Sequence, residues 1–420
     1  MSRLRNVTTA LAAVLLTAPA AMAYDIQMPG NDTKLSVYGF VYALTEYYTT
    51  GASETNSSYL MDKGSSNMGN VLNQTKTPGN NLLMSVQPSR YGFASVTPTA
   101  AFGDITTKIE FDMNGVTTAG TAFHMRHAYA TVGNWVFGHT YTAWIDLDAL
   151  ADEVDWQGLI GTPAYDTPRR PQIRYTFNFD KKNKLAVSVE NNKGLDGDSY
   201  TAAGTAPSTT PAGVQDGKIP TLVLAYTYSD TWGHIGVRGV TMNHAEFIPA
   251  TAGVDSVHFN KQGGAGMVSG DVKFGKDDLV FSAYYGSGLG DYGYGTQSAN
   301  FVNTTANPEA VYLYKNVGWT VGYTHVFTPT WRANAVISGV NFKGDSDIAT
   351  TNGTNGTDTK SRLDYLVNCF YTVNKNTQFG LEYFQERARP FGKGLVLTDN
   401  GSYANSATSG RVEFVLQAKF

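Results

Sequence analysis

The sequence predicts an all-β protein, a transmembrane antiparallel β-barrel of about sixteen strands whose apolar outer face meets lipid. Three observations predict it. The chain begins with an export signal, and many segments alternate between polar and apolar residues with period two. The connections between those segments alternate between short turns and long polar stretches.

The N-terminus has the pattern of a secretory signal peptide. Two arginines precede an apolar stretch over residues 10–21, and Ala21-Met22-Ala23 is a small-residue cleavage site. A short buried helix is the alternative. We expect residues 1–23 to be removed on export and residues 24–420 to form a single barrel domain.

The composition excludes several classes of protein. Lys+Arg 31 nearly balance Asp+Glu 35, so the basic excess typical of nucleic-acid binding is absent. Aromatic residues reach 12%, which argues against disorder. After the signal no apolar run is long enough for a transmembrane helix. The one cysteine, Cys369, cannot form an internal disulfide, and the histidines show no metal-ligand spacing, so we expect no cofactor and no metal.

Alternation is clearest in three segments. Over 104–113 the even positions are Asp, Thr, Lys, Glu and Asp, whereas the odd positions are Ile, Thr, Ile, Phe and Met. Segments 172–180 and 411–420 alternate in the same way. Successive strand residues point to opposite faces, so each segment has a polar and an apolar face. We expect strands at 34–46, 86–99, 103–114, 122–132, 135–146, 171–180, 183–192, 220–229, 232–246, 264–274, 278–288, 310–327, 331–344, 359–374, 376–388 and 409–420.

The regular change in connection length indicates a meander with two unlike ends. Outer-membrane barrels have short periplasmic turns and long extracellular loops, and the same pattern appears here. A soluble β-sandwich would instead bury its apolar faces against each other. The export signal, the strand lengths and the Tyr and Phe residues near strand ends favour the membrane barrel.

One long connection is rich in acids. It is the loop at about 147–170, and its first part carries Asp146, Asp148, Asp152, Glu153 and Asp155. Leucines and a tryptophan lie among these acids, so we expect the loop to fold into the channel as a constriction. The alternatives are a solvated surface loop and a calcium loop. A calcium loop lacks support because its glycine at position six and glutamate at position twelve are missing.

Arginines lie on the neighbouring strands. Arg169, Arg170 and Arg174 follow the acidic loop, and Arg90 and Arg126 lie on earlier strands. An arginine on the lipid face near the bilayer midplane would cost about 2–4 kcal/mol, so we expect these side chains in the lumen. Acids facing arginines across a narrow channel would select charged solutes. These acids and arginines are the candidate pore constriction.

Several motifs resemble those of Gram-negative trimeric porins, and most closely those of the DcaP-like porins. The motifs are Lys34-Leu-Ser-Val-Tyr-Gly-Phe-Val41, Pro88-Ser-Arg-Tyr-Gly-Phe93, Gly103-Asp-Ile-Thr-Thr-Lys-Ile-Glu-Phe-Asp112, Met125-Arg-His-Ala-Tyr129, Arg170-Pro-Gln-Ile-Arg-Tyr-Thr176, Phe274-Gly-Lys-Asp-Asp-Leu279 and the terminal Phe420. Some members of this family carry an N-terminal coiled coil. Here only residues 24–33 precede the first expected strand, so we expect that feature to be absent.

The resemblance implies an outer-membrane homotrimer and passive diffusion of small hydrophilic, charged solutes, dicarboxylates among them. Carried over by position, it implies that Arg90, Arg126, Arg170 and Arg174 are lumen arginines and that the acids from Asp146 to Asp155 lie on a constriction loop. It also implies that the barrel-insertion machinery reads Phe420. The alternative functions are an outer-membrane enzyme or adhesin built on a barrel and a secreted glycan-binding β-protein, although no catalytic motif is present.

Overall fold

A computed structural model describes most of the chain. The described residues are 24–28, 32–50, 81–117, 120–154, 168–191, 214–215, 219–248, 257–293, 299–304, 307–343, 359–391, 396–397 and 403–420. Within these ranges there is no helix with the length and apolar character needed to span a membrane. The expected signal peptide lies outside the described residues and stays a prediction.

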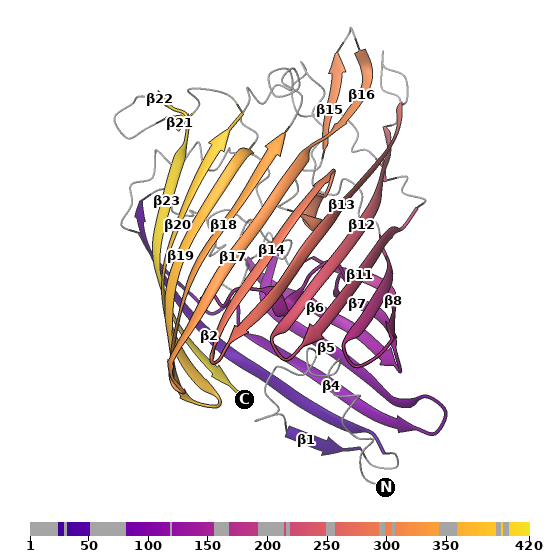
Figure 1. Ribbon diagram of the computed structural model, residues 1–420, viewed down its shortest axis with the longest axis vertical. Coiled ribbons are helices and arrows are strands. Elements are labelled where there is room, and N and C mark those ends of the chain that lie inside the picture. Colours follow the sequence, from indigo (N-terminus) through magenta and orange to yellow (C-terminus); the bar gives the residue numbers. More distant parts are fainter. Residues whose placement is uncertain are drawn as a thin grey trace.

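Sixteen long strands of the described chain form a closed antiparallel barrel (Figure 1). Each pairs with the next, and β2 (Lys34–Thr50) closes the ring by pairing with both β4 (Arg90–Thr99) and β23 (Ala407–Lys419). The other wall strands are β5 (Gly103–Thr117), β6 (Gly120–Val132), β7 (Trp135–Tyr141), β8 (Arg169–Asn178), β9 (Asn183–Glu190), β11 (Thr221–Asp230), β12 (Gly233–Ile248), β13 (Val257–Phe274), β14 (Asp277–Ser287), β17 (Lys315–Thr328), β18 (Trp331–Lys343), β19 (Thr359–Asn374) and β20 (Thr377–Pro390). The fold class predicted from the sequence is confirmed.

Smaller elements extend the two ends of the wall. At its start β2 pairs with β1 (Tyr24–Gln27), and near its end it pairs with β3 (Asn81–Ser85). A hairpin of β15 (Ala299–Thr304) and β16 (Asn307–Leu313) rises above the barrel (Figure 1). The two-residue strands are β10 (Val214–Gln215), which pairs with β12, and β21 (Val396–Leu397) and β22 (Tyr403–Ala404), which pair with each other.

The hairpin corrects one expected strand. The sequence predicts a single strand over 310–327, but the structure breaks it at Tyr314 between β16 and β17. Tyr314 is 4% exposed and packs with Val340 and Phe342, so its side chain turns inward at the rim. Only β17 belongs to the wall.

The two ends of the barrel differ, as expected. Short turns join consecutive strands at the end where β1 and the last residues of β23 lie (Figure 1). Three of these turns contain a glycine with positive φ, which a residue without a Cβ adopts without strain: Gly103 at 71°, Gly133 at 55° and Gly275 at 68°. The long connections leave the opposite end.

The apolar strand faces point outward. On β5, Ile109 is 44% exposed, whereas Glu110 and Asp112 are 5% and 0% exposed. Aromatic side chains gather on the outer face beside the short turns. Trp135 lies 4.7 Å from Tyr175, and Trp331 lies 4.8 Å from Tyr371, measured between ring centroids. Tyr and Trp at one level of a barrel are typical of the lipid–water boundary.

Candidate channel constriction

The acidic loop leaves the wall earlier than expected. The predicted strand 135–146 ends at Tyr141, because Thr142 starts a turn. The Thr142 carbonyl accepts a hydrogen bond from the Ile145 N–H at 3.4 Å, and its Oγ1 accepts one from the Trp144 N–H at 3.2 Å. The chain then runs on through a short 3₁₀ turn, η2 (Leu147–Ala149), to Val154.

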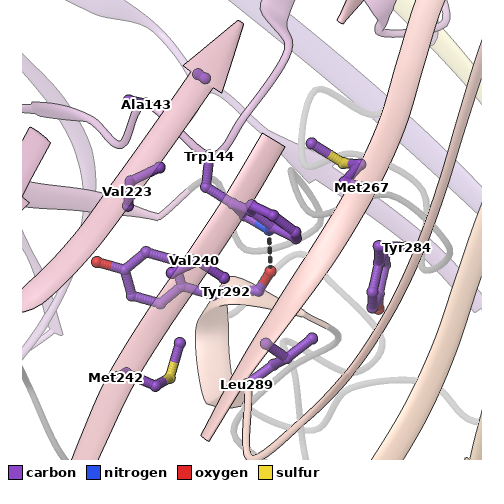
Figure 2. Packing of buried hydrophobic residues seen from close by; sticks show 10 residues of the cluster. Ala143, Trp144, Val223, Val240, Met242, Met267, Tyr284, Leu289 and Tyr292 are labelled. Atoms are coloured by element: carbon purple, nitrogen blue, oxygen red, sulfur yellow. Dashed lines mark hydrogen bonds between the residues drawn. The ribbon is translucent and has the colours of Figure 1, made fainter. Parts of the chain in front are cut away.

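Trp144 fixes the start of this loop to the inner wall. It is fully buried among side chains of β11 to β14, including Val240, Met267 and Tyr284 (Figure 2). Its indole Nε1 donates a hydrogen bond to the Tyr292 carbonyl at 2.7 Å, in the 3₁₀ turn η3 (Gly290–Tyr292). A buried tryptophan with a satisfied N–H is a strong anchor.

Asp146 makes the first polar anchor. Its Oδ2 accepts hydrogen bonds from Arg238 Nη1 at 2.8 Å, His234 Nε2 at 2.9 Å and Ser269 Oγ at 2.6 Å. His234 also contacts Asp271 through Nδ1. Burial alone raises the pKa of Asp146, but the hydrogen bond from His234 and the charge on Arg238 outweigh it and lower that pKa to about 2. Asp146 is therefore a charged tether to β12 and β13.

The end of the described loop makes a second anchor on other strands. Asp152 Oδ2 accepts a hydrogen bond from Arg332 Nε of β18 at 2.6 Å. The Val154 N–H donates to Glu382 Oε2 of β20 at 2.8 Å, and Tyr42 of β2 donates to the Val154 carbonyl. Val154 is fully buried in an apolar cluster with Tyr42, Leu44, Phe370 and Val415.

The two anchors place the loop inside the barrel. Residues 146–154 reach from β12 and β13 to β18, β20 and β2, which lie on different parts of the closed ring. Only a segment that runs through the lumen can contact the polar inner faces of all these strands. The loop therefore occupies part of the lumen.

A group of charged side chains, here called the wall cluster, lies on the inner faces of β4 to β8. Its members are Arg90, Lys108, Glu110, Asp112, Arg126 and Arg169. Arg126 Nη1 lies 2.6 Å from Asp112 Oδ2, and Arg126 Nε lies 3.4 Å from Glu110 Oε1. Lys108 Nζ lies 3.1 Å and Arg90 Nη1 3.7 Å from Glu110. Arg90, Lys108 and Arg126 thus contact the two carboxylates, and Arg169 lies near enough to interact with Asp112 through its charge.

A β-bulge builds part of the wall cluster. Glu110 pairs with His127 and Phe111 with Met125, so Arg126 is an extra residue on β6. Because a bulge shifts the alternation by one residue, both Arg126 and His127 turn inward, at 0% and 4% exposure. His127 Nδ1 lies 3.0 Å from Thr140 Oγ1.

The other predicted site residues lie close by. Arg170 is 3% exposed, and its guanidinium lies 5.5 Å from the centre of the Tyr292 ring. Arg169 stacks over Tyr141 at 5.5 Å. Arg174 is half-buried on β8, and no carboxylate of the described chain lies within ion-pair distance of it. On the loop, Asp148 is exposed and Glu153 is half-buried, while Asp155 lies outside the described residues.

Sequence reasoning missed several contributors. Lys108, Glu110 and Asp112 belong to the polar face of the clearest alternating segment, but nothing in their spacing distinguishes them from ordinary lumen residues. His234 and Arg238 are 88 and 92 positions from Asp146 in the sequence, and only the barrel brings them to it. No group of three or more His, Cys, Asp or Glu side chains in the described ranges is arranged to hold a metal ion.

Comparison with known proteins identifies relatives of the chain. The family model described as DcaP outer membrane protein matches residues 6–396. The crystal structure of the outer membrane channel DcaP of Acinetobacter baumannii is similar with a TM-score of 0.72 at 21% identity, covering 94% of this chain and 99% of that one. No curated protein sequence matches.

Other outer-membrane proteins share the fold at lower identity. An anion-selective porin from Comamonas acidovorans has a TM-score of 0.55 at 9% identity, with 92% of this chain and 100% of that one covered. The trimer form of OmpT, an outer membrane protein of Vibrio cholerae, has a TM-score of 0.54 at 10% identity, with 92% and 99% covered.

Proposed function

Because the chain belongs to the DcaP outer membrane protein family and folds as a porin barrel of the Gram-negative outer membrane, we propose that it is a passive channel for small hydrophilic anions, dicarboxylates in particular. The channel needs no cofactor and carries out no reaction. Its constriction lies between the loop over residues 142–154 and the wall cluster.

The observation that carries this proposal is the cationic excess of the wall cluster. Arg90, Lys108, Arg126 and Arg169 gather around Glu110 and Asp112. Arg174 of β8 adds a further cation. Two unit charges 4 Å apart interact by about 4 kcal/mol at an effective dielectric constant of about 20, so such a wall favours anions strongly.

Two of the loop's acids contribute little to cancelling this field. Asp146 forms an ion pair with Arg238, and Asp152 forms one with Arg332. The charge of each acid is therefore largely balanced by the arginine that anchors the loop. This differs from the simple sequence picture of free acids opposite free arginines, and it favours anion over cation selectivity. A dicarboxylate suits the wall because its two charged ends can meet different cations along β4 to β8.

The test is the reversal potential of single channels in a planar bilayer under a salt gradient. The native protein should be anion-selective. Lys108→Gln and Arg174→Gln should each lower the anion-to-cation permeability ratio by at least about fivefold, which corresponds to about 1 kcal/mol. Arg389→Gln is the matched control, because Arg389 is exposed at the outer rim of β20.

Competition completes the experiment. Succinate or phthalate should reduce the chloride current of the native channel, and the reduction should weaken in Arg174→Gln but not in Arg389→Gln. Protein that conducts no ions, or a channel whose selectivity is the same in all four proteins, would refute the assignment.

We also propose that residues 1–23 are removed on export, that Phe420 is read during insertion and that the protein is a homotrimer. Phe420 is well placed for this, since its N–H donates to the Gly39 carbonyl at 2.9 Å at the closing seam. The OmpT of Vibrio cholerae that shares the fold is described in a trimer form. The intact mass of the purified protein, insertion of a Phe420→Ala variant and cross-linking in detergent test these three proposals.

A further inference from the structure

Three glutamates lie side by side on the inner wall behind the second anchor of the loop. Glu382 of β20 is directly opposite Glu413 of β23, and Glu413 is directly opposite Glu46 of β2. All three are buried, at 1%, 0% and 1% exposure. Directly opposed like charges are unfavourable in a sheet, so this row needs an explanation.

The hydrogen bonds of Glu382 and Glu413 use one oxygen of each carboxyl group. Glu382 Oε2 accepts from the Val154 N–H at 2.8 Å and from Asn368 Nδ2 at 2.9 Å. Glu413 Oε1 accepts from Arg411 Nε at 2.8 Å. Glu382 Oε1 and Glu413 Oε2 are buried and receive no N–H or O–H hydrogen bond from the described residues. The strand register places the two carboxyl groups opposite each other on the buried inner face.

Two acceptors that face each other in a buried site need a proton between them. Two adjacent ionised carboxylates repel, and a buried anion without a cation is costly, so such pairs commonly hold one proton. We propose that Glu382 is a neutral carboxylic acid that carries its proton on Oε1 and donates it to Glu413 Oε2, and that this pair is a proton-dependent latch for the end of the constriction loop. The gating role rests on the proposed channel function, whereas the shared proton does not.

The charged neighbours leave no cation for Glu382. The titratable groups that face the pair are Glu46, Tyr42 and Tyr48 of β2, Arg332 of β18, Arg362 and Asp364 of β19, Glu386 of β20, Arg411 of β23 and Asp152 of the loop. Arg411 forms an ion pair with Glu413, and Arg332 forms one with Asp152. Arg362 lies 2.9 Å from Glu386. No ion pair involves Glu382 in the described part of the chain.

Loss of the proton would release the latch. A deprotonated Glu382 repels Glu413, and its side chain can relieve that repulsion only by moving away from β23. The Val154 N–H is bonded to the same carboxyl group, so the end of the loop moves with it. The loop is therefore held at neutral pH and freed at alkaline pH.

Infrared spectroscopy of the purified full-length protein in liposomes tests the proton directly. At pH 7 an ordinary glutamate, with a pKa of about 4.3, is ionised and shows no protonated-carboxyl stretch. We expect the native protein to show this band and Glu382→Gln to lose it. Glu386→Gln is the matched control, because Glu386 lies on the same strand and face but is paired with Arg362. Should Glu382→Gln fail to assemble, Glu413→Gln must shift the band, since the acceptor changes from a carboxylate to an amide.

Single-channel recording tests the latch. The amide of Glu382→Gln can still accept from Val154 and donate to Glu413, so this variant should keep the neutral-pH conductance and lose the rise in open-channel noise that we expect of the native channel at alkaline pH. Absence of the band at neutral pH, or its survival in Glu382→Gln, overturns the proposal. A protein that shows the band but conducts no ions would instead refute the proposed function and leave the shared proton intact.

Discussion

Replacing Asp146 with Asn should free the first part of the constriction loop from the wall. The amide keeps the shape and can still accept a hydrogen bond, but the negative charge is lost. Arg238, which is 7% exposed, then remains buried without its carboxylate partner. The perturbation therefore acts on charge and leaves volume almost unchanged.

Two arguments give the size of the effect. Removing one partner of a buried ion pair costs about 3–5 kcal/mol. The pKa of Asp146 is lowered from an ordinary 3.8 to about 2, which by linkage corresponds to about 2–3 kcal/mol of stabilisation. Because the folded-state pKa is the lower one, this contribution is present above pH about 4 and is lost as the pH falls toward about 2. We expect a loss of about 2–5 kcal/mol at neutral pH.

Hydrogen exchange of the peptide that covers residues 142–154 measures this loss, because protection reports local opening. Protection should fall by roughly 50-fold or more in Asp146→Asn. Asp148→Asn is the control, since Asp148 is an exposed acid of the same loop. Equal protection in the two variants would refute the anchoring role of Asp146.

Three further outcomes are expected. Trp144→Ala should destabilise the loop by about 3–5 kcal/mol, seen in the same exchange experiment, because it empties a fully buried site; unchanged protection would mean that the indole does not hold the loop. Ile109→Arg should cost about 2–4 kcal/mol and impair folding into liposomes, whereas Phe102→Arg in a short turn should assemble normally; normal assembly of both would invert our assignment of the lipid face. In native protein, protection of residues 142–150 should persist at pH 5 and fall below pH about 4, and protection that persists to pH 2 would remove Asp146 from the anchor.

The wall of the barrel could be predicted from sequence because a strand repeats every two residues. Ile109 and Glu110 must face opposite sides whatever lies beside them, so lipid and lumen faces follow from local pattern alone. The turns could be predicted from the sequence as well, because glycines such as Gly133 and Gly275 lie where the chain reverses.

The site was less predictable, because it depends on pairing across strands. The bulge at Arg126 exists only relative to its partner strand β5, and period-two counting places Arg126 and His127 on opposite faces. Glu46, Glu382 and Glu413 are far apart in sequence, and Glu382 alone looks like one more polar residue of a wetted face. Closure of the ring brings them together, and no local window contains that information.

The double attachment of the loop has a mechanical consequence. A closed ring that a taut segment cross-links at two points cannot be deformed without straining that segment. Residues 146–154 form such a cross-link from β12 and β13 to β18 and β20, so lateral pressure on the barrel strains the segment that we propose as the constriction. The width of the proposed constriction then depends on the barrel wall and the loop together. Lipids that exert a different lateral pressure on the barrel should therefore alter its conductance, although they do not contact the lumen.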